Sequence, residues 1–513
     1  FNDVIIIFLA VMITDVLLLD VFNTLGLPTS TTVSVIFSLL GASVALAVYK
    51  VYVSNDSFST LGKYINTEKA SEIVYSILLS VALSFALGSL VQYVSRLIFT
   101  FHIEKRYKYV AALFGGVAMT AITFFILVKG LKSITFVPSE VKDFIKESPL
   151  TIIAYSLILW TIVCQLLISV FKYSVFKFII IVGTFGLALA FAGNDLVNFI
   201  GVPIAAYQAF EIWAAPGQTV GATEFMMSGL EKENLPAPFI FLALAGLVMV
   251  YTLWTSKKAK SVIETEQNLS RQGEGNEKYN ANTLSRNLVR AMMYLGNIIS
   301  FILPKSLQRK LDAQFVQPEY TGKRDEQPMF DMVRASVNLI VASILISVGT
   351  SMKLPLSTTY VTFMVAMGSS FADRAWDRES AVYRVAGVFN VIGGWFVTAL
   401  AAFLSSAIIA YTLFIGEVFA FFALMIVVAI FFYRSNQLHK KKVKEQEEIK
   451  SLRKEDILTI KEMITESSSQ ISKVLHKTST LYTNVIDNLG LQDLAKLKKK
   501  KKSHKKLEKE IDE

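Results

Sequence analysis

Long apolar blocks constrain the fold of this chain more than any other feature of its sequence. A helix that crosses the hydrocarbon core of a bilayer needs about 20 consecutive, mostly apolar residues. Stretches close to this length recur along most of the chain: Val4–Phe22, Val33–Val53, Ile73–Val94, Val110–Val128, Thr151–Val170, Phe178–Ala192, Phe239–Trp254, Ala335–Ser351, Val385–Thr412 and Phe414–Tyr433. A soluble protein could bury one or two such helices, but not this many. The sequence therefore predicts an all-α, polytopic membrane protein.

The composition excludes several other classes of protein. Of the 513 residues 18% are charged, whereas about a quarter are charged in a typical soluble domain. The one cysteine, Cys164, lies in an apolar stretch and the four histidines are scattered, which excludes a disulfide framework and a cysteine-based metal site. The sequence contains neither a Walker A motif nor a GxSxG motif. We therefore expect no enzymatic activity, no resident cofactor or metal, and no nucleic-acid partner.

Two polar regions divide the chain. Residues 1–255 and 335–433 hold the apolar blocks, whereas 256–334 and 434–513 are polar. Residues 434–513 contain 20 Lys and Arg against 13 Asp and Glu, so +7 of the chain's net +10 lies there. Positive charge beside membrane segments favours the cytoplasmic side. We therefore predict a cell-membrane protein, most compatible with a bacterial inner membrane, with a cytoplasmic loop over 256–334 and a basic, helical cytoplasmic tail.

A short internal repeat points to an architecture of two related halves. The segment Leu27-Pro-Thr-Ser-Thr-Thr32 recurs as Leu354-Pro-Leu-Ser-Thr-Thr359, at an offset of 327 residues. The same offset carries Gly41 onto Gly368 in the apolar stretch that follows each copy. Secondary transporters are often built from two such halves, with the substrate site where the halves meet.

Each copy of the repeat has the chemistry of an anion site. Proline breaks the preceding helix, and Ser or Thr caps the helix that follows. A helix that begins inside the membrane presents free N–H groups and the positive end of its dipole, which together attract anions. The hydroxyls that would add donors are Ser30, Thr31, Thr32, Ser357, Thr358 and Thr359. The alternative is that these side chains only cap a kinked helix or bond to its own carbonyls.

A third segment, Ala192-Gly-Asn-Asp-Leu-Val-Asn198, follows a long apolar run. An ionisable residue at membrane depth is expensive and is a functional candidate. Asp195 and Asn198 are three residues apart and share a helix face, and Gly193 would allow the backbone to unwind and expose carbonyls. Carboxylate, amide and carbonyl oxygens suit a hard cation, so Asn194, Asp195 and Asn198 are candidate cation ligands. A capped helix turn near the interface is the alternative.

The two kinds of site imply coupling. A carboxylate at Asp195 would repel an anion held by the Ser/Thr segments, strongly so in low dielectric. A bound cation or a proton on the carboxylate removes that repulsion, so anion transport would depend on a co-ion. Asp20, which lies close to the first Ser/Thr segment, is a further candidate for cation binding. Asp15 is five residues away, about 140° around the helix, so both cannot face one site.

Other polar residues have plainer interpretations. The segment Asp373-Arg-Ala-Trp-Asp-Arg-Glu379 follows the second Ser/Thr helix and indicates a polar loop at the membrane surface, with a gate or an electrostatic funnel as the alternative. Trp395 suits helix packing better than ligand binding.

Together the three motifs resemble those of the inorganic phosphate transporter (PiT) family of sodium- or proton-coupled symporters, over roughly Phe1–Tyr433. That family carries a G-A-N-D-x-x-N and a P-x-S-[TSG]-[TS] signature in each of two inverted halves. Ala192–Asn198 matches the second N-D copy, with Gly and Ala exchanged, and Pro28–Thr32 and Pro355–Thr359 match the two Ser/Thr signatures. The resemblance implies two inverted repeats with broken or re-entrant helices, which import inorganic phosphate with Na⁺ or H⁺.

The same resemblance assigns roles to residues. It implies that the six hydroxyls donate to phosphate and that Asp195 and Asn198 belong to the phosphate and cation site. The first half should carry its own Asn-Asp-x-x-Asn, yet the 27 residues before Pro28 show none. We expect that signature to lie upstream of Phe1, in which case this chain alone would hold an incomplete site.

Three alternatives remain open from the sequence. The transported anion could be sulfate, arsenate or another tetrahedral oxyanion. The chain could instead be a membrane-anchored phosphate sensor that signals through its tail, where Glu462–Leu489 is similar in pattern to the opening helices of PhoU-like regulators. The tail could equally form a coiled coil or an interaction helix, with Lys496–Lys502 as a solvated run or a contact for anionic lipid. A homo-oligomer is compatible with all three.

Overall fold

The computed structural model contains two compact units, Phe1–Phe432 (unit 1) and Tyr433–Glu513 (unit 2), which are described separately. It describes the chain apart from residues 56, 102–107, 129–137, 139, 141–142, 144–146, 216–219, 232–234, 236, 273–281, 303, 317–329, 353, 355, 377, 453–459, 491–503 and 505–513. Pro355 of the second Ser/Thr segment and the lysine run 496–502 therefore lie outside the described residues.

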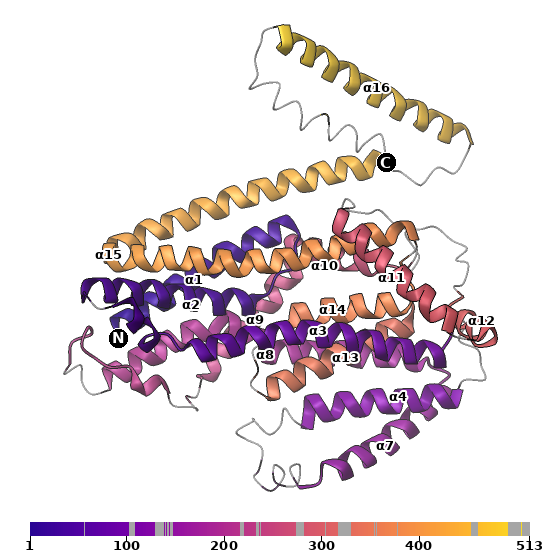
Figure 1. Cartoon of the computed structure of the whole chain (residues 1–513), viewed down its shortest axis with the longest axis horizontal. Coiled ribbons are helices and arrows are strands. Elements are labelled where there is room, and N and C mark those ends of the chain that lie inside the picture. The colour runs from indigo at the N-terminus through magenta and orange to yellow at the C-terminus, as the bar shows by residue number, and fades with distance from the viewer. Residues whose placement is uncertain are drawn as a thin grey trace. The chain divides into compact units, whose positions relative to one another are not determined.

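Unit 1 is a bundle of helices whose long members run lengthwise through it (Figure 1). Its α-helices are α1 (Asn2–Leu25), α2 (Thr31–Val53), α3 (Thr67–Ile98), α4 (Lys108–Ile122), α7 (Pro149–Ser169), α8 (Val175–Ala214), α9 (Phe239–Thr255), α10 (Lys257–Ser270), α11 (Thr283–Ile302), α12 (Lys305–Gln314), α13 (Met332–Ser351), α14 (Thr358–Ala372) and the first part of α15 (Arg378–Leu452). Short helical segments are η1 (Phe58–Lys63), η3 (Thr123–Val128) and η4 (Ser228–Glu231).

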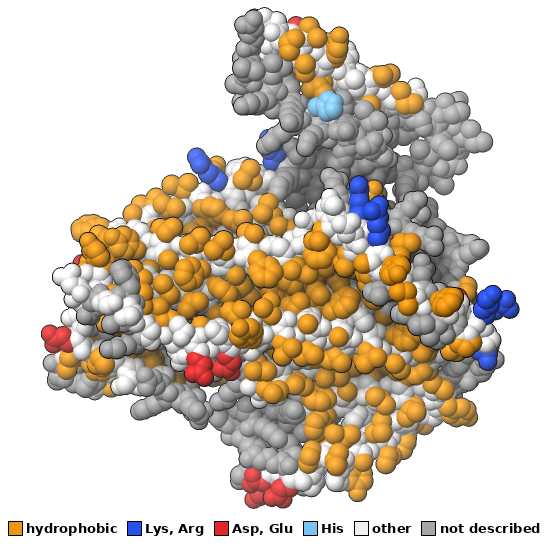
Figure 2. Space-filling model, viewed as in Figure 1, with side chains coloured by type: hydrophobic (Ala, Val, Ile, Leu, Met, Phe, Trp, Pro, Cys, Tyr) orange, Lys and Arg blue, Asp and Glu red, His pale blue; other side chains and the backbone are white. Residues whose placement is uncertain are grey.

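Seven of the described helices are long and apolar enough to cross a membrane: α1, α2, α3, α7, α8, α13 and α15. The sides of the bundle are apolar as well, and Figure 2 shows hydrophobic side chains over most of the visible face of unit 1. Phe239 and Trp254, at the two ends of α9, are 82% and 83% exposed, as expected of residues that face lipid. The predicted all-α, polytopic architecture is confirmed.

The helices α2 and α14 both begin inside the bundle, each capped by its Ser/Thr segment. Before α2, Gly26 ends α1 in the left-handed conformation (φ 67°), which a glycine adopts without steric cost. Ser30 then accepts a hydrogen bond from the Val33 N–H at 3.1 Å. Ser357 accepts from the Tyr360 N–H at 3.2 Å in the same way. The two copies of the repeat therefore build the same local structure.

The repeated glycines mark two close helix contacts. A Cβ at Gly41 would lie 2.1 Å from the carbonyl oxygen of Phe403 in α15, and one at Gly368 would lie 2.3 Å from that of Phe85 in α3. Only glycine permits such approaches. The helix after the first Ser/Thr segment therefore packs on the last long helix of unit 1, and the helix after the second packs on α3.

The predicted unwinding at Gly193 is wrong. The helix α8 continues through Ala192–Asn198 and beyond it to Ala214, with Pro203 inside it. No bulky neighbour displaces the chain at Gly193, since a Cβ there would meet nothing within 4 Å. Asn194 and Asp195 consequently present side chains from a regular helix, and their backbone carbonyls stay in its hydrogen-bond ladder.

A buried charge cluster ties three helices together at one end of the bundle. Arg96 of α3 donates to Asp373, at the end of α14, at 2.6 Å and 2.7 Å. It also donates to Asp331, the N-cap of α13, at 2.8 Å and 3.0 Å. Arg96 and Asp373 are 0% and 1% exposed. The charge-dense segment is therefore anchored in the interior through Asp373, although the Arg374 side chain is exposed and pairs with Asp312.

The polar region between α9 and α13 is only partly a peripheral loop. In α10, Thr265 donates to the Gly26 carbonyl at 2.9 Å, and the Ser270 carbonyl accepts from Ser370 at 3.2 Å. These contacts join α10 to the end of α1 and to α14. Unit 2 contains the remainder of α15 and α16 (Ile460–Gly490). Among the apolar side chains of α16, Ile471 and Leu475 are exposed.

Candidate functional site

Asp195 joins the two Ser/Thr segments. Its carboxylate accepts from the Thr358 hydroxyl at 2.7 Å and 2.9 Å, and from the Thr31 hydroxyl at 3.4 Å. Thr358 opens α14 and Thr31 opens α2, which lie 327 residues apart in sequence. The three motifs identified in the sequence therefore meet at one carboxylate.

Amide side chains of α8 complete this network. Asn198 donates to the hydroxyls of Thr32 at 2.8 Å and Thr31 at 3.2 Å. Asn194 donates to the carbonyl of Leu356 at 3.4 Å, and Thr32 donates to the same carbonyl at 3.2 Å. Leu356 thus contributes a backbone oxygen at the centre of the site, a role that its apolar side chain gives no means of predicting.

The serines of the two segments have a local role. Ser30 and Ser357 are each 1% exposed, and the oxygen of each caps its own helix as described above. Helix capping therefore accounts for the hydrogen bond that each serine oxygen accepts. Each hydroxyl still carries a hydrogen that it can donate. Thr359 is partly buried in the first turn of α14, and its carbonyl accepts from Thr362.

The electrostatics of the site favour negative charge. The starts of α2 and α14 both approach Asp195, and helix N-termini stabilise anions. A threonine hydroxyl donates one hydrogen at a time. An oxyanion that accepted hydrogen bonds from Thr31 and Thr358 would therefore take them from Asp195. The carboxylate would then need a cation or a proton in their place.

Asp20 lies in a different interaction from the one expected. Its carboxylate pairs with Lys258 of α10 at 2.6 Å, whereas the Asp195 network is built from α2, α8 and α14. On α1 it is Asp15 that faces α2, where it accepts from Ser34 at 2.5 Å and Ser38 at 3.2 Å. Helical phase explains the difference, because residues five apart point to different sides of a helix.

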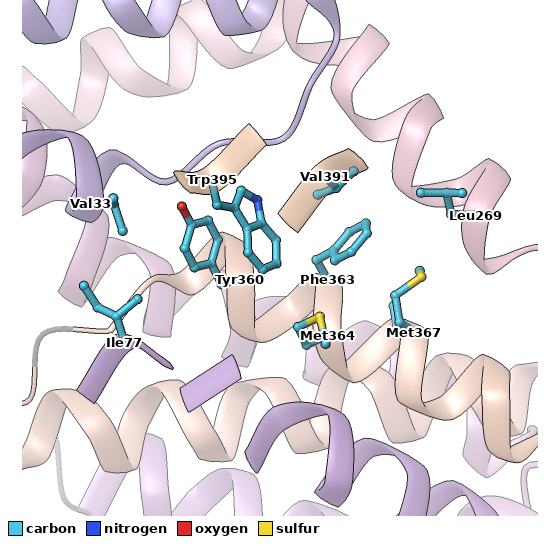
Figure 3. Close-up of a cluster of buried hydrophobic side chains, with 10 residues drawn as sticks. Val33, Ile77, Leu269, Tyr360, Phe363, Met364, Met367, Val391 and Trp395 are labelled. Carbon is cyan, nitrogen blue, oxygen red and sulfur yellow. The ribbon is translucent and has the colours of Figure 1, made fainter. Parts of the chain in front are cut away.

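Trp395 contacts both the first Ser/Thr segment and the residue that follows the second one. Its indole N–H donates to the Pro28 carbonyl at 3.2 Å, and its ring stacks on Tyr360 with centroids 3.7 Å apart. Figure 3 shows these two rings lying face to face beside Phe363. Nearby, the hydroxyls of Thr29 and Thr398 lie 2.9 Å apart. The sequence indicated a packing role for Trp395, and the structure adds a specific contact with the first Ser/Thr segment.

Beside the network lies an apolar cavity of about 1330 Å³ between α8 and α9. Phe191 and Phe199 line it from α8, and Leu244 and Val248 line it from α9. Asp195 stands on its wall, so the carboxylate has an apolar surface on one side and the threonine hydroxyls on the other.

Comparison with known proteins gives the site its context. Residues 1–265 match the model of the phosphate transporter family. No curated protein matches the chain. Among solved structures, one described as the sodium-dependent phosphate transporter is similar, with 17% sequence identity, coverage of 80% of this chain and 89% of that chain, and a TM-score of 0.41. The family match covers more than half of the sequence and includes the first Ser/Thr segment and Asp195. The chain belongs to the phosphate transporter family, a family of membrane transporters and not of enzymes.

Proposed function

We propose that this protein imports inorganic phosphate across the cell membrane together with Na⁺ or H⁺. The observation that supports this most strongly is the meeting of Thr31 and Thr358 at Asp195. Two helix starts and several hydroxyls converge there, which is the donor set that a tetrahedral oxyanion requires. Phosphate would accept hydrogen bonds from Thr31, Thr32, Thr358 and Thr359.

The co-ion would interact with the carboxylate and amides of α8. When phosphate takes the hydroxyls, Asp195 is left beside a second negative charge in a poorly solvated site. The repulsion between two such charges is several kcal/mol even at an effective dielectric of about 20. Na⁺ held by oxygens of Asp195, Asn194 and Asn198, or a proton on Asp195, offsets that repulsion. Phosphate and co-ion would then bind together.

Alternating access around this site is the mechanism we propose. The two Ser/Thr segments come from the two halves of the chain and face each other at Asp195. At Gly41, a helix of the proposed first half packs on a helix of the second half, and at Gly368 a helix of the second half packs on a helix of the first. This reciprocal arrangement supports a relation by inverted repeats. The polar regions, including unit 2, would lie on the cytoplasmic side, following the distribution of positive charge.

The test is phosphate uptake by two threonine variants of one helix. Thr358→Val removes a donor to Asp195, and to phosphate in the proposed complex. A hydrogen bond to a charged group is worth about 1.5–3 kcal/mol, so KM for phosphate should rise about tenfold to a hundredfold. Thr362→Val is the control, because the Thr362 hydroxyl donates only to carbonyls of its own helix in the described structure, and its KM should be unchanged.

Two further measurements separate the alternatives. Labelled phosphate uptake with and without a sodium or proton gradient tests coupling, and uptake that ignores both gradients would contradict it. Competition by sulfate and arsenate tests the solute. A stronger inhibition by sulfate than by unlabelled phosphate would assign the site to a different oxyanion.

A further inference from the structure

The helix α11 has an apolar face that unit 1 leaves uncovered. Leu284, Leu288 and Ile298 recur at spacings that place them on one side of the helix. They are 59%, 39% and 41% exposed. Phe301, in the last turn of the same helix, is 93% exposed. In water this surface would be unfavourable, because each of these side chains gains free energy when it is removed from water.

Positive charge accompanies this apolar face. Arg286 and Arg290 are exposed, lie one turn apart on the side of α11 away from Leu284, Leu288 and Ile298, and share a helix that contains no acidic residue. The next helix, α12, adds Lys305, Arg309 and Lys310. The acidic residue of α12, Asp312, is paired with Arg374 at 2.8 Å. The surface of these two helices is therefore basic.

Their position in the bundle matches a membrane boundary. In Figure 1 the long helices of unit 1 run lengthwise, whereas α11 runs obliquely at one end of them. The residue after α12, Phe315, stacks on Tyr93 near the end of α3, with centroids 6.0 Å apart. Arg96, which anchors the buried charge cluster, lies one turn further along α3. The helix pair thus lies where the spans emerge.

We propose that α11 and α12 form a membrane-surface helix pair that binds anionic lipid headgroups. An apolar face with arginines opposite it is the composition of a helix that lies in the interface, with its apolar side among the acyl chains. Basic side chains beside that face attract anionic headgroups. A bilayer is the occupant that the chain's own spans bring to this end, and its charge complements the helix pair. This inference is independent of the transported solute.

The test places a fluorophore on the apolar face of the whole protein. Leu288→Cys in a Cys164→Ser background gives one labelling site for an environment-sensitive dye. The protein is reconstituted in vesicles of phosphatidylcholine, with or without one quarter phosphatidylglycerol. We expect blue-shifted emission that nitroxide-labelled acyl chains quench. Emission typical of water would overturn the proposal, as would a protected dye that the lipid quencher does not reach, since the latter would show that protein covers the face.

Charge selectivity is tested with the unlabelled protein. Native mass spectrometry from mixed lipid should show phosphatidylglycerol retained over phosphatidylcholine. The double variant Arg286→Gln with Arg290→Gln should lower that preference at least threefold, whereas Arg286→Lys with Arg290→Lys should keep it. Equal retention of the two lipids by the unaltered protein, or an unchanged preference in the glutamine variant, would contradict the assignment to anionic headgroups.

Discussion

At the scale of single residues, Asp195 links the parts of the candidate site. It accepts hydrogen bonds from Thr31, Thr358, Asn194 and Asn198. These donors come from the starts of two helices and from its own helix. A charge at this point influences both halves of the site at once.

We expect Asp195→Asn to uncouple phosphate from its co-ion. The amide keeps the size of the side chain and removes the charge that the cation or proton would neutralise. Uptake should fall at least a hundredfold, and the remaining uptake should lose its dependence on the gradient. The measurement is initial uptake at several sodium concentrations and pH values. Residual uptake with an unchanged dependence on the gradient would place the co-ion elsewhere.

Trp395→Phe should weaken phosphate binding without unfolding the protein. A smaller aromatic ring can still stack on Tyr360, but the hydrogen bond to the Pro28 carbonyl is lost, which costs about 1 kcal/mol. KM should rise about fivefold. Trp160→Phe is the matched control, because Trp160 donates to the Thr123 hydroxyl at 3.1 Å, away from the site. Equal effects of the two variants on KM would reduce Trp395 to a packing residue.

At the scale of elements, the sequence predicted those features that depend on a few neighbouring residues, such as helix starts. It did not predict features that depend on contacts between distant parts of the chain. The Ser/Thr segments predicted two helix starts because capping needs only a hydroxyl and the next turn. Gly193 indicated a break, yet α8 continues, since the neighbours of a helix decide whether a glycine bends it. Asp20 was chosen by distance along the chain, and its partner Lys258 lies 238 residues away. No periodicity reveals such a partner.

The helix α10 gives a prediction about pH. Burial raises the pKa of Glu266 to about 7 from an ordinary value of 4.5. The folded protein therefore favours the protonated carboxyl. The stability of the fold that depends on a protonated Glu266 is fully present below about pH 4.5 and is lost as pH rises through 7. Glu266→Gln should consequently raise the melting temperature relative to the unaltered protein at pH 8.5, with no gain at pH 4.5.

Thermal unfolding in detergent over this pH range measures the effect. Glu224→Gln, which changes an exposed carboxylate, is the control and should show no such trend. A melting-temperature difference for Glu266→Gln that is constant with pH would mean that the carboxyl is not protonated in the fold.

At the scale of the whole molecule, the apolar blocks determined the architecture, because a chain in lipid must satisfy its backbone within helices. The helices that the blocks predicted are present. The cluster at Arg96 could not be predicted in this way. Asp331 and Asp373 lie 235 and 277 residues from Arg96 in sequence. The sequence predicts a cytoplasmic loop around Asp331 and a polar loop at the membrane surface around Asp373. Only the fold shows that both pair with Arg96, Asp373 fully buried and Asp331 partly so.

The buried cluster should contribute far more to stability than an exposed ion pair of the same chemistry. Arg96→Leu removes the hydrogen bonds from Arg96 to Asp331 and Asp373, leaves Asp373, among the described side chains, only Gln92 at 3.0 Å and Arg334 at 3.8 Å, and should cost about 3–5 kcal/mol of unfolding free energy. Arg374→Gln breaks the exposed pair with Asp312 and should cost about 0–1 kcal/mol. Equilibrium unfolding in mixed micelles compares the two. Similar losses of unfolding free energy in the two variants would show that the cluster at Arg96 contributes no more to stability than an exposed ion pair.

The glycine contacts at positions 41 and 368 have a mechanical consequence. At these two points α2 packs on α15 and α14 packs on α3 with no side chain between the helices. In the alternating-access mechanism proposed above, a movement of α2 against α15 would therefore be accompanied by a movement of α14 against α3. A crosslink between α2 and α15 should then also restrict the movement of α14 against α3, although the crosslink changes no residue at the contact between α14 and α3.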